Sequence, residues 1–358
     1  MDENVPKHVE AVLADVFAER EVEAGWIGMD FLDALGALRD FVLNGGKRIR
    51  PTFAWWGWRG AGGDPDSPEA GAVLSAISAL ELVQAGALIH DDVMDASAVR
   101  RGAPTMHVAF TERHHRAGWL GPADRFGQSA AILLGDVALT WADDLFHGAG
   151  LPPAAHERAL LPWRAMRTEV LAGQYVDVLT QAGGDSSAEA ALRVSRLKTA
   201  AYTVERPLHL GAALAGAGPE LTAAYRAYGA DVGIAFQLRD DLLGVFGDPS
   251  VTGKPAGDDL REGKRTLLVS LGITRAEHAG RSRDADALRD CLGNPDLTTA
   301  DVGRAREILV SVGAVAEIEE RIGDLTESGL AALDITEIAA PARTRLAGLA
   351  IRATRRDR

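Results

Sequence analysis

The sequence predicts an all-α fold, a single large bundle of antiparallel helices. Long windows repeat apolar residues at i, i+3, i+4 and i+7, with Ala and Leu dominant, which is the pattern of a helix with one buried face. Alternating apolar and polar residues, the pattern of a half-buried strand, are almost absent. No stretch has the composition of an interdomain linker, so we expect residues 1–358 to form one domain.

Each expected helix is a window with this periodicity, bounded by residues that interrupt it. In chain order the windows are 5–22, 28–43, 50–60, 68–95, 124–147, 154–181, 186–216, 219–244, 265–278, 298–311, 312–334 and 340–352. Clusters of Gly, Pro and Asp at 60–65, 119–122 and 247–257 account for the clearest breaks. The chain has 39 glycines, a high number for a helical protein, and many are expected to allow close helix packing or to line a cavity.

Charge and composition exclude several classes of protein. Lys and Arg number 38 against 51 Asp and Glu, a net charge of −13, so a surface-wide basic footprint for nucleic acid is excluded. The N-terminus is acidic and amphipathic, unlike a signal peptide, and no apolar stretch is expected to reach the ~20 residues of a membrane span. The single cysteine, Cys291, forms no internal disulfide and fits a reducing cytoplasm.

The first acidic cluster lies where the 68–95 helix ends. Asp91 and Asp95 are four residues apart, which places both carboxylates on one helix face, and Asp92 lies beside them. Like charges at this spacing repel each other, and the dipole at a helix C-terminus disfavours anions. Hard divalent cations held by carboxylate oxygens would explain the arrangement. The alternative is a solvated acidic helix end.

A second acidic cluster ends the 219–244 helix. Asp240 and Asp241 stand together, and Gln237 lies one turn earlier on the same face. Lys254 and Lys264 follow in a Gly-rich segment, TGKPAGDDLREGK, where backbone and ammonium groups can approach an anion closely. Either lysine alone would be interpreted as a solvated surface charge.

Two basic segments accompany the acidic clusters. In LNGGKRIRP, residues 43–51, two glycines precede a group of cations that includes Lys47 and Arg50 at the start of a helix, which favours anion binding. Arg100 and Arg101 follow the first acidic cluster directly, where they can pair with its aspartates or hold phosphate oxygens in a forked geometry. Acids suited to Mg²⁺ thus alternate with bases suited to phosphate, which predicts a polyphosphate substrate bridged by metal. The rival phosphate motif, GxxxxGK[ST] after a strand, is absent from the sequence.

At this point the motifs match a known family. The chain resembles the trans-type isoprenyl diphosphate synthases, or polyprenyl synthetases, through GGKRIRP, DDVMD-x4-RRG, Lys198-Thr199 and FQLRDD with its GK-x8-GK tail, in the family's order over residues 43–268. The resemblance implies a bundle around a deep central cavity and the condensation of isopentenyl diphosphate with an allylic diphosphate. It also implies three Mg²⁺ ions and a homodimer.

The resemblance assigns a role to each matching residue. The implied metal ligands are acidic: Asp91, Asp92, Asp95, Asp240 and Asp241. The residues implied to hold the allylic diphosphate are basic: Arg100, Lys198, Lys254 and Lys264. Thr199 and Gln237 would face the reacting carbons. The residues implied to bind isopentenyl diphosphate are Lys47, Arg50, Gln84 and Arg101.

Two positions depart from the family pattern, and one segment has no clear match. Position 244 is Gly, where the second acidic motif often has a third acid, and Gln84 replaces the His of many bacterial members. Segment 114–127 has no evident counterpart in shorter members, and His114 and His115 are expected to be surface loop residues.

Product length is expected to depend on the residues just before Asp91. The family places bulky aromatics there to stop the chain at fifteen carbons, whereas Val83, Gly86 and Ala87 are not aromatic. One helix turn of ~5.4 Å is about one isoprene unit, so the expected product is mainly the twenty-carbon geranylgeranyl diphosphate. Farnesyl or longer products are the alternatives. Trp141 could form a lower floor, but it is expected to be ordinary core.

Two other functions remain as alternatives. A class I terpene cyclase also uses an aspartate-rich helix and Mg²⁺, but its second motif does not fit 240–248 and it lacks GGKRIRP. A non-catalytic subunit of a heteromeric synthase usually loses one acidic motif, whereas both are present here.

Overall fold

The computed structural model describes residues 1–248 and 256–354. Within these residues the predicted all-α fold is confirmed, since the strands form only one short antiparallel hairpin, β1 (Val99–Arg100) with β2 (Ala103–Pro104). The helices of the first half are α1 (Val5–Glu23), η1 (Gly25–Ile27), α2 (Met29–Leu43), α3 (Ile49–Gly60), α4 (Ala70–Met94), α5 (Met106–Ala117), α6 (Ala123–Gly148) and α7 (Pro153–Gly183). Those of the second half are α8 (Ala188–Val194), η2 (Ser195–Glu205), α9 (Arg206–Ala215), α10 (Pro219–Phe246), α12 (Asp258–Arg261), α13 (Leu267–His278), α14 (Ser282–Cys291), α15 (Thr299–Ser311), α16 (Ala314–Ala332) and α17 (Ala342–Thr354).

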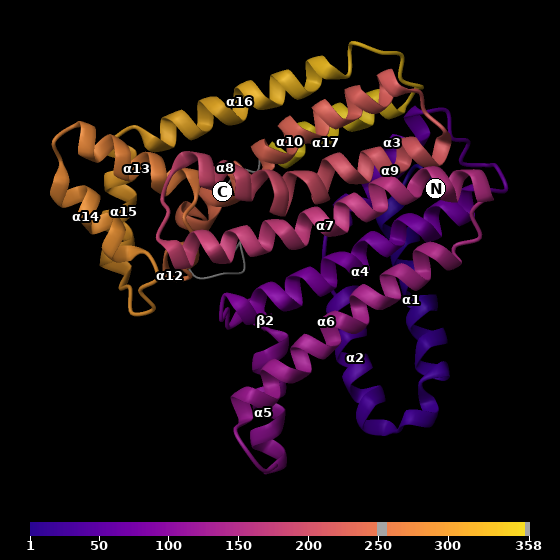
Figure 1. Ribbon diagram of the computed structural model, residues 1–358, viewed down its shortest axis with the longest axis horizontal. Helices are drawn as coiled ribbons and strands as arrows, with labels where there is room; N and C mark the ends of the chain where they lie inside the picture. The colour runs from indigo at the N-terminus through magenta and orange to yellow at the C-terminus, as the bar shows by residue number, and fades with distance from the viewer. Residues whose placement is uncertain (249–255, 355–358) are drawn as a thin grey trace.

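Long helices run side by side across the molecule, and two helical hairpins, α1–α2 and α5–α6, project from it (Figure 1). Proline lies in the first turn of α1, α7, α9 and α10, where its missing N–H costs little. Thr266 caps α13, and Thr298 forms a capping box with Asp301 at α15. These local signals explain where several of the helices begin.

The buried apolar residues form two clusters. The first gathers α1–α7, η2, α9, the N-terminal half of α10, the end of α16 and α17. The second gathers the C-terminal half of α10 with α8 and α12–α16. Along α10, Tyr228 belongs to the first cluster and Leu238 to the second. This one helix therefore belongs to both clusters.

The expected helix 186–216 has a π-helical centre. It runs as α8, η2 and α9, and η2 is the π-helical segment, a geometry found often at functional sites. Glycines of the neighbouring helices let η2 approach closely. A Cβ at Gly173 of α7 would lie 2.4 Å from the Lys198 backbone nitrogen, and a Cβ at Gly233 of α10 would lie 2.6 Å from the Ala200 Cα. These contacts fix the backbone that carries Lys198 and Thr199.

The sequence failed to predict helices α5 and α14. Helix α5 occupies part of the segment expected to be a surface loop, and the expectation is wrong for His114, which is buried. The His114 Nε2 lies 3.1 Å from the Leu120 carbonyl oxygen, and its ring packs against Trp119 and Phe126. His115 is exposed, as expected, but it is helical. Aromatic packing between α5 and α6 explains the difference.

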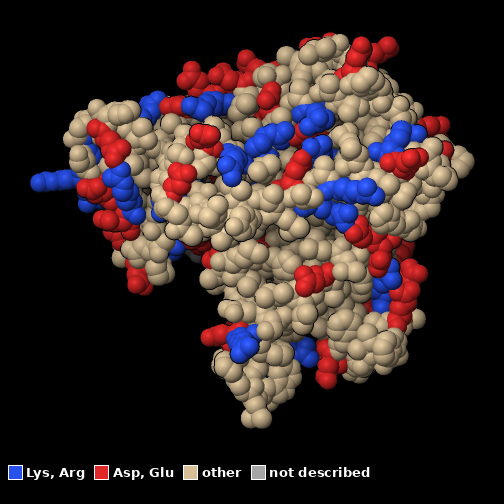
Figure 2. Space-filling view, viewed as in Figure 1, with Lys and Arg blue, Asp and Glu red and all other residues tan. Residues whose placement is uncertain are grey.

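Helix α4 is long and apolar enough to span a membrane, contrary to the expectation that no stretch reaches that length. In the structure, 72% of its most apolar window is buried. Length and composition alone do not separate such a helix from a core helix, and the burial of α4 is typical of a core helix. Acidic and basic side chains are interspersed over the face of the molecule that Figure 2 shows.

Candidate active site

The first acidic cluster is buried at the end of α4, so it is not a solvated helix end. Asp91 and Asp92 are buried, and the Asp95 side chain is only 3% exposed. Arg100 of β1 turns back over them. Its Nε donates to Asp92 Oδ1 at 2.7 Å, and its Nη2 donates to Asp91 Oδ2 at 3.2 Å. Hairpin β1–β2 therefore positions a guanidinium directly against the carboxylates.

Lys198 of η2, from a distant part of the chain, contacts the same acidic cluster. Its Nζ lies 2.9 Å from Asp91 Oδ1 and 2.6 Å from Asp177 Oδ2. Asp177, a buried acid on α7, was missed by sequence reasoning. Its signal was an acid at an apolar position, because it shares a buried face with Val170 and Gly173 at helical spacing.

The second acidic cluster is linked to η2 by a chain of hydrogen bonds. Thr199 Oγ1 donates to Gln237 Oε1 at 2.5 Å, and Gln237 Nε2 donates to Asp241 Oδ1 at 2.6 Å. Asp241 is buried and Asp240, next to it on α10, is half-buried. The structure therefore brings Thr199, Gln237 and Asp241 together.

Lys264 connects the two acidic clusters. Its Nζ lies 2.6 Å from Glu262 Oε2, 3.6 Å from Asp259 Oδ1 and 3.7 Å from Asp95 Oδ2. Ser97 Oγ also donates to Glu262 Oε1 at 2.5 Å, which ties the chain after α4 to the chain after α12. The other lysine of this segment, Lys254, lies outside the described residues.

The site holds more acid than it can ionise without added positive charge. Burial would raise the pKa of Asp91, but Lys198, Lys264 and Arg100 lower it to about 2. Burial and the charge of Asp91 raise the pKa of Asp95 to about 6. Burial raises the pKa of Asp241 to about 8. Divalent cations would allow all three to ionise. Among the described residues, however, no three acidic, His or Cys side chains are grouped closely enough to hold an ion, because the carboxylates are drawn to Arg100, Lys198 and Lys264.

A third carboxylate lies beside the second cluster. A Cβ at Gly244 would lie 1.8 Å from Asp259 Oδ2 of α12, so the space that a side chain at 244 would need is already filled by Asp259. Sequence reasoning noted the missing acid at 244 but did not identify Asp259, because the contact depends on how α12 folds back onto α10.

Gln84 and Arg101 line a cavity of about 10 Å³, the room of roughly one water molecule, beside Phe41 of α2. The glycine pair before Lys47 lies against Arg101, since a Cβ at Gly45 would lie 2.8 Å from Arg101 Nη1. Burial lowers the pKa of the Arg101 guanidinium, and the charges of Arg100, Arg48 and Arg50 lower it further. Several guanidinium groups this close together favour the binding of an anion.

The middle cation of GGKRIRP has a structural partner. Arg48 Nη1 lies 2.9 Å from Glu81 Oε2, and both side chains are only 2% exposed. Arg48 Nη2 donates to the Val42 carbonyl at 2.7 Å. Arg48 therefore fixes the loop between α2 and α3, while Lys47 beside it is exposed.

The residues expected to set product length lie at positions i, i+3 and i+4 of α4, which are neighbours on a helix. Val83 is buried in the first cluster, and Ala87 is half-buried against it. Gly86 faces α6, where a Cβ would lie 2.7 Å from Leu139 Cγ. Trp141 packs edge-on against Phe17 of α1, with ring centroids 5.7 Å apart.

Buried carboxylates from two helix ends, with cations between them, give this all-helical protein a charged centre of the kind that suits a diphosphate substrate. Residues 34–309 match the family model described as Polyprenyl synthetase, and the chain belongs to that family.

Proteins similar to this chain are named as prenyl diphosphate synthases. The chain is 36% identical to geranylfarnesyl diphosphate synthase of Aeropyrum pernix over 82% of this chain and 86% of that protein. It is 32% identical to geranylgeranyl diphosphate synthase of Mycobacterium tuberculosis, over 84% and 76%. A crystal structure of geranylgeranyl pyrophosphate synthase from Corynebacterium glutamicum, complexed with isoprenyl diphosphate and magnesium, superimposes with a TM-score of 0.96 at 48% identity, over 99% of each chain.

Proposed function

We propose that the chain is a Mg²⁺-dependent, chain-elongating prenyltransferase that condenses isopentenyl diphosphate with allylic diphosphates and forms mainly geranylgeranyl diphosphate. The observation that carries this proposal is the position of Lys264 between the two acidic clusters. Its Nζ lies 3.7 Å from Asp95 Oδ2 of the first cluster and 3.6 Å from Asp259 Oδ1, which lies beside the second. Membership of the polyprenyl synthetase family and the names of the relatives support the same reaction.

The chain's own residues would bind and orient both substrates. Lys198, Lys264 and Arg100 now contact carboxylates, and the allylic diphosphate would displace these contacts when these three residues bind it. Lys254 would bind the same diphosphate. Three Mg²⁺ ions held by the acidic residues would neutralise the charge that develops on the departing diphosphate. Asp91, Asp92 and Asp95 would provide ligands from α4, and Asp240 and Asp241 from α10.

The second substrate would occupy the basic region near the α2–α3 loop. Lys47, Arg50, Gln84 and Arg101 would bind isopentenyl diphosphate, and Gln84 and Arg101 already share one cavity. The Thr199–Gln237 hydrogen bond would face the reacting carbons. Attack by the alkene on the allylic cation and loss of a proton to the departing diphosphate complete the reaction that the family resemblance implies.

One experiment separates this function from its alternatives. We expect the purified protein with Mg²⁺, isopentenyl diphosphate and an allylic starter of five, ten or fifteen carbons to give elongated diphosphates, resolved by chromatography after dephosphorylation. A terpene cyclase would instead release hydrocarbon or alcohol from the starter alone. A non-catalytic subunit would give no product without a partner, and no product from any starter would contradict the proposal.

The proposed twenty-carbon product depends on Ala87. We expect Ala87→Phe to shorten the main product to fifteen carbons, because an aromatic ring one turn before Asp91 takes the room of about one isoprene unit. Ala87→Val should give an intermediate distribution with similar total turnover. Product length read by chromatography tests this, and an unchanged product in both variants would refute the pocket assignment.

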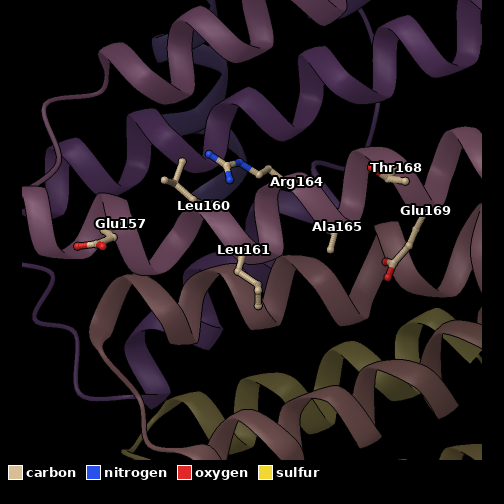
Figure 3. A pocket seen from close by; sticks show the side chains of 7 residues that line it. All are labelled: Glu157, Leu160, Leu161, Arg164, Ala165, Thr168 and Glu169. Atoms are coloured by element: carbon tan, nitrogen blue, oxygen red, sulfur yellow. The ribbon is translucent and has the colours of Figure 1, made fainter.

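We also propose that two copies pair through the outer face of α7 and the adjacent part of α6. Exposed apolar residues follow one face of α7 at helical spacing, Leu161, Leu171, Tyr175 and Leu179. Ile132 and Leu133 are exposed on α6. A groove on α7 carries both Arg164 and Glu157 (Figure 3), and a two-fold axis would bring such opposite charges together. A second copy therefore fits this face.

Charge substitution on this face tests the pairing. We expect Leu171→Glu to convert a dimer to a monomer in analytical ultracentrifugation, because the carboxylate would be buried without a partner. Ile335→Glu, at an equally apolar exposed position away from α7, is the matched control and should leave the mass unchanged. An unchanged mass in the Leu171 variant would place the contact elsewhere.

We propose, finally, that residues 1–358 act as one domain in the cytoplasm, with no nucleic-acid partner. The sharing of α10 by both apolar clusters supports one domain. The single cysteine is compatible with a reducing compartment, and the net charge of −13 disfavours nucleic acid.

A further inference from the structure

Arg50 is held by two residues that sequence reasoning did not assign. Its guanidinium carbon lies 3.9 Å from the centroid of the Tyr202 ring, within cation–π distance. Its Nη2 donates to Thr203 Oγ1 at 2.9 Å. Tyr202 and Thr203 are adjacent residues of η2, more than 150 positions further along the chain. The contact therefore exists only because η2 packs against the start of α3.

The charge of Arg50 is otherwise poorly compensated. Arg50 is buried, its Nε has no hydrogen-bond partner, and no carboxylate of the described residues lies within ion-pairing distance of it. Arg48, two residues away, contrasts with it, because Arg48 is paired with Glu81. A buried guanidinium without a carboxylate is costly to keep unless an anion binds it. Arg50 therefore has donors left for an incoming anion.

Tyr202 and Thr203 fix different properties of this guanidinium. A ring face restricts the plane of the group, and a hydrogen bond at Nη2 restricts its rotation within that plane. With both fixed, the remaining N–H groups keep one direction, which is what forked recognition of a phosphate requires. Thr203 is 1% exposed, so no water replaces its hydroxyl readily.

We infer that Tyr202 and Thr203 are positioning residues that orient Arg50 toward the diphosphate of isopentenyl diphosphate. This inference rests on the proposed role of Arg50 in binding that substrate. The π-helical turn matters because it places a ring and a hydroxyl at consecutive positions against one guanidinium. Neither side chain is required to touch the substrate, since both act through Arg50.

The test measures each substrate's KM separately. We expect Thr203→Val to raise the KM for isopentenyl diphosphate about ten-fold, the size of one hydrogen bond to a charged group. The KM for the allylic diphosphate and kcat should change less than about two-fold. Thr203→Ser, which keeps the hydroxyl, should restore the wild-type KM. Tyr202→Leu should behave like Thr203→Val, whereas Tyr202→Phe, which keeps the ring, should not.

Two controls exclude a general structural effect. Ser195→Ala removes another buried hydroxyl of η2, one that donates to the Ala191 carbonyl, and should leave both KM values unchanged. In an Arg50→Met background, Thr203→Val should add no further effect, because its partner is gone.

The outcomes separate the two proposals. If Arg50→Met leaves the KM for isopentenyl diphosphate unchanged, the proposed role of Arg50 fails. If Arg50→Met raises that KM but Thr203→Val and Tyr202→Leu do not, only the positioning inference fails. It fails also if the effect of Thr203→Val persists in the Arg50→Met background, or if both KM values rise together.

Discussion

Replacing Asp91 or Asp95 by asparagine is expected to slow turnover by two to three orders of magnitude, the size of losing one preorganised electrostatic contact in an active site. Asparagine has nearly the same shape but no charge, so it cannot hold a divalent cation as a carboxylate does. Asp91 also accepts contacts from Lys198 and Arg100, which orient those cations. Steady-state rates with Mg²⁺ and saturating substrates measure the loss.

The fold should survive both substitutions. Burial and the charge of Asp91 raise the pKa of Asp95, so Asp95→Asn removes a repulsion from the folded state. Asp91→Asn instead loses the contacts of Asp91 with Lys198 and Arg100, so we expect it to lower stability without unfolding the protein. Asp143→Asn is the matched control, because Asp143 also accepts from an arginine and a tryptophan but lies outside the site. Circular dichroism and thermal unfolding report on the fold. Near-normal rates in both site variants would remove the metal assignment.

Adding one methyl group at Gly173 should disable the protein without changing any polar residue. The Cβ of Gly173→Ala would lie 2.4 Å from the backbone nitrogen of Lys198 and 2.7 Å from its Cα. Backbone atoms cannot rotate away, so α7 and η2 must separate. We expect a stability loss of about 1–3 kcal/mol, as for overpacked cores. Displacing Lys198 and Thr199 should reduce kcat/KM by about 10²-fold.

Gly323→Ala is the control for this substitution. Gly323 lies inside α16, and a Cβ there meets no atom within 4 Å. Alanine favours helix over glycine, so this variant should gain up to about 1 kcal/mol of stability and keep full activity. Urea unfolding and steady-state kinetics compare the two. Equal behaviour of both variants would show that η2 tolerates displacement from α7.

The acidic motifs could be predicted from the sequence because they depend on local spacing. Asp91 and Asp95 share a face by helix geometry alone, and the Gln237–Asp241 contact likewise spans four residues of one helix. Asp177 could not be assigned in the same way. Its apolar spacing indicates a buried acid, but its role depends on a contact with Lys198, which lies on a different helix.

Other features were missed because only tertiary packing creates them. No local signal distinguishes the π-helical centre of 186–216 from an ordinary helix, since glycines at 173 and 233 make room for it from two other helices. Similarly, Arg48 and Arg50 are equivalent by sequence spacing. They differ because Glu81 on α4 meets one of them, while Thr203 on η2 meets the other.

Helix α10 connects the proposed ligand-binding residues to both apolar clusters of the molecule. Its first half belongs to the same apolar cluster as α4, whose end carries Asp91 and Asp95, while Asp240 and Asp241 lie on the half that shares a cluster with α13–α16. A ligand that bridges the two acidic clusters must hold the two apolar clusters at one separation. The free energy of binding such a ligand then includes the free energy of holding the two apolar clusters at that separation. Substitutions at the apolar contacts of α10 can therefore alter affinity from a distance, even though they touch no substrate atom.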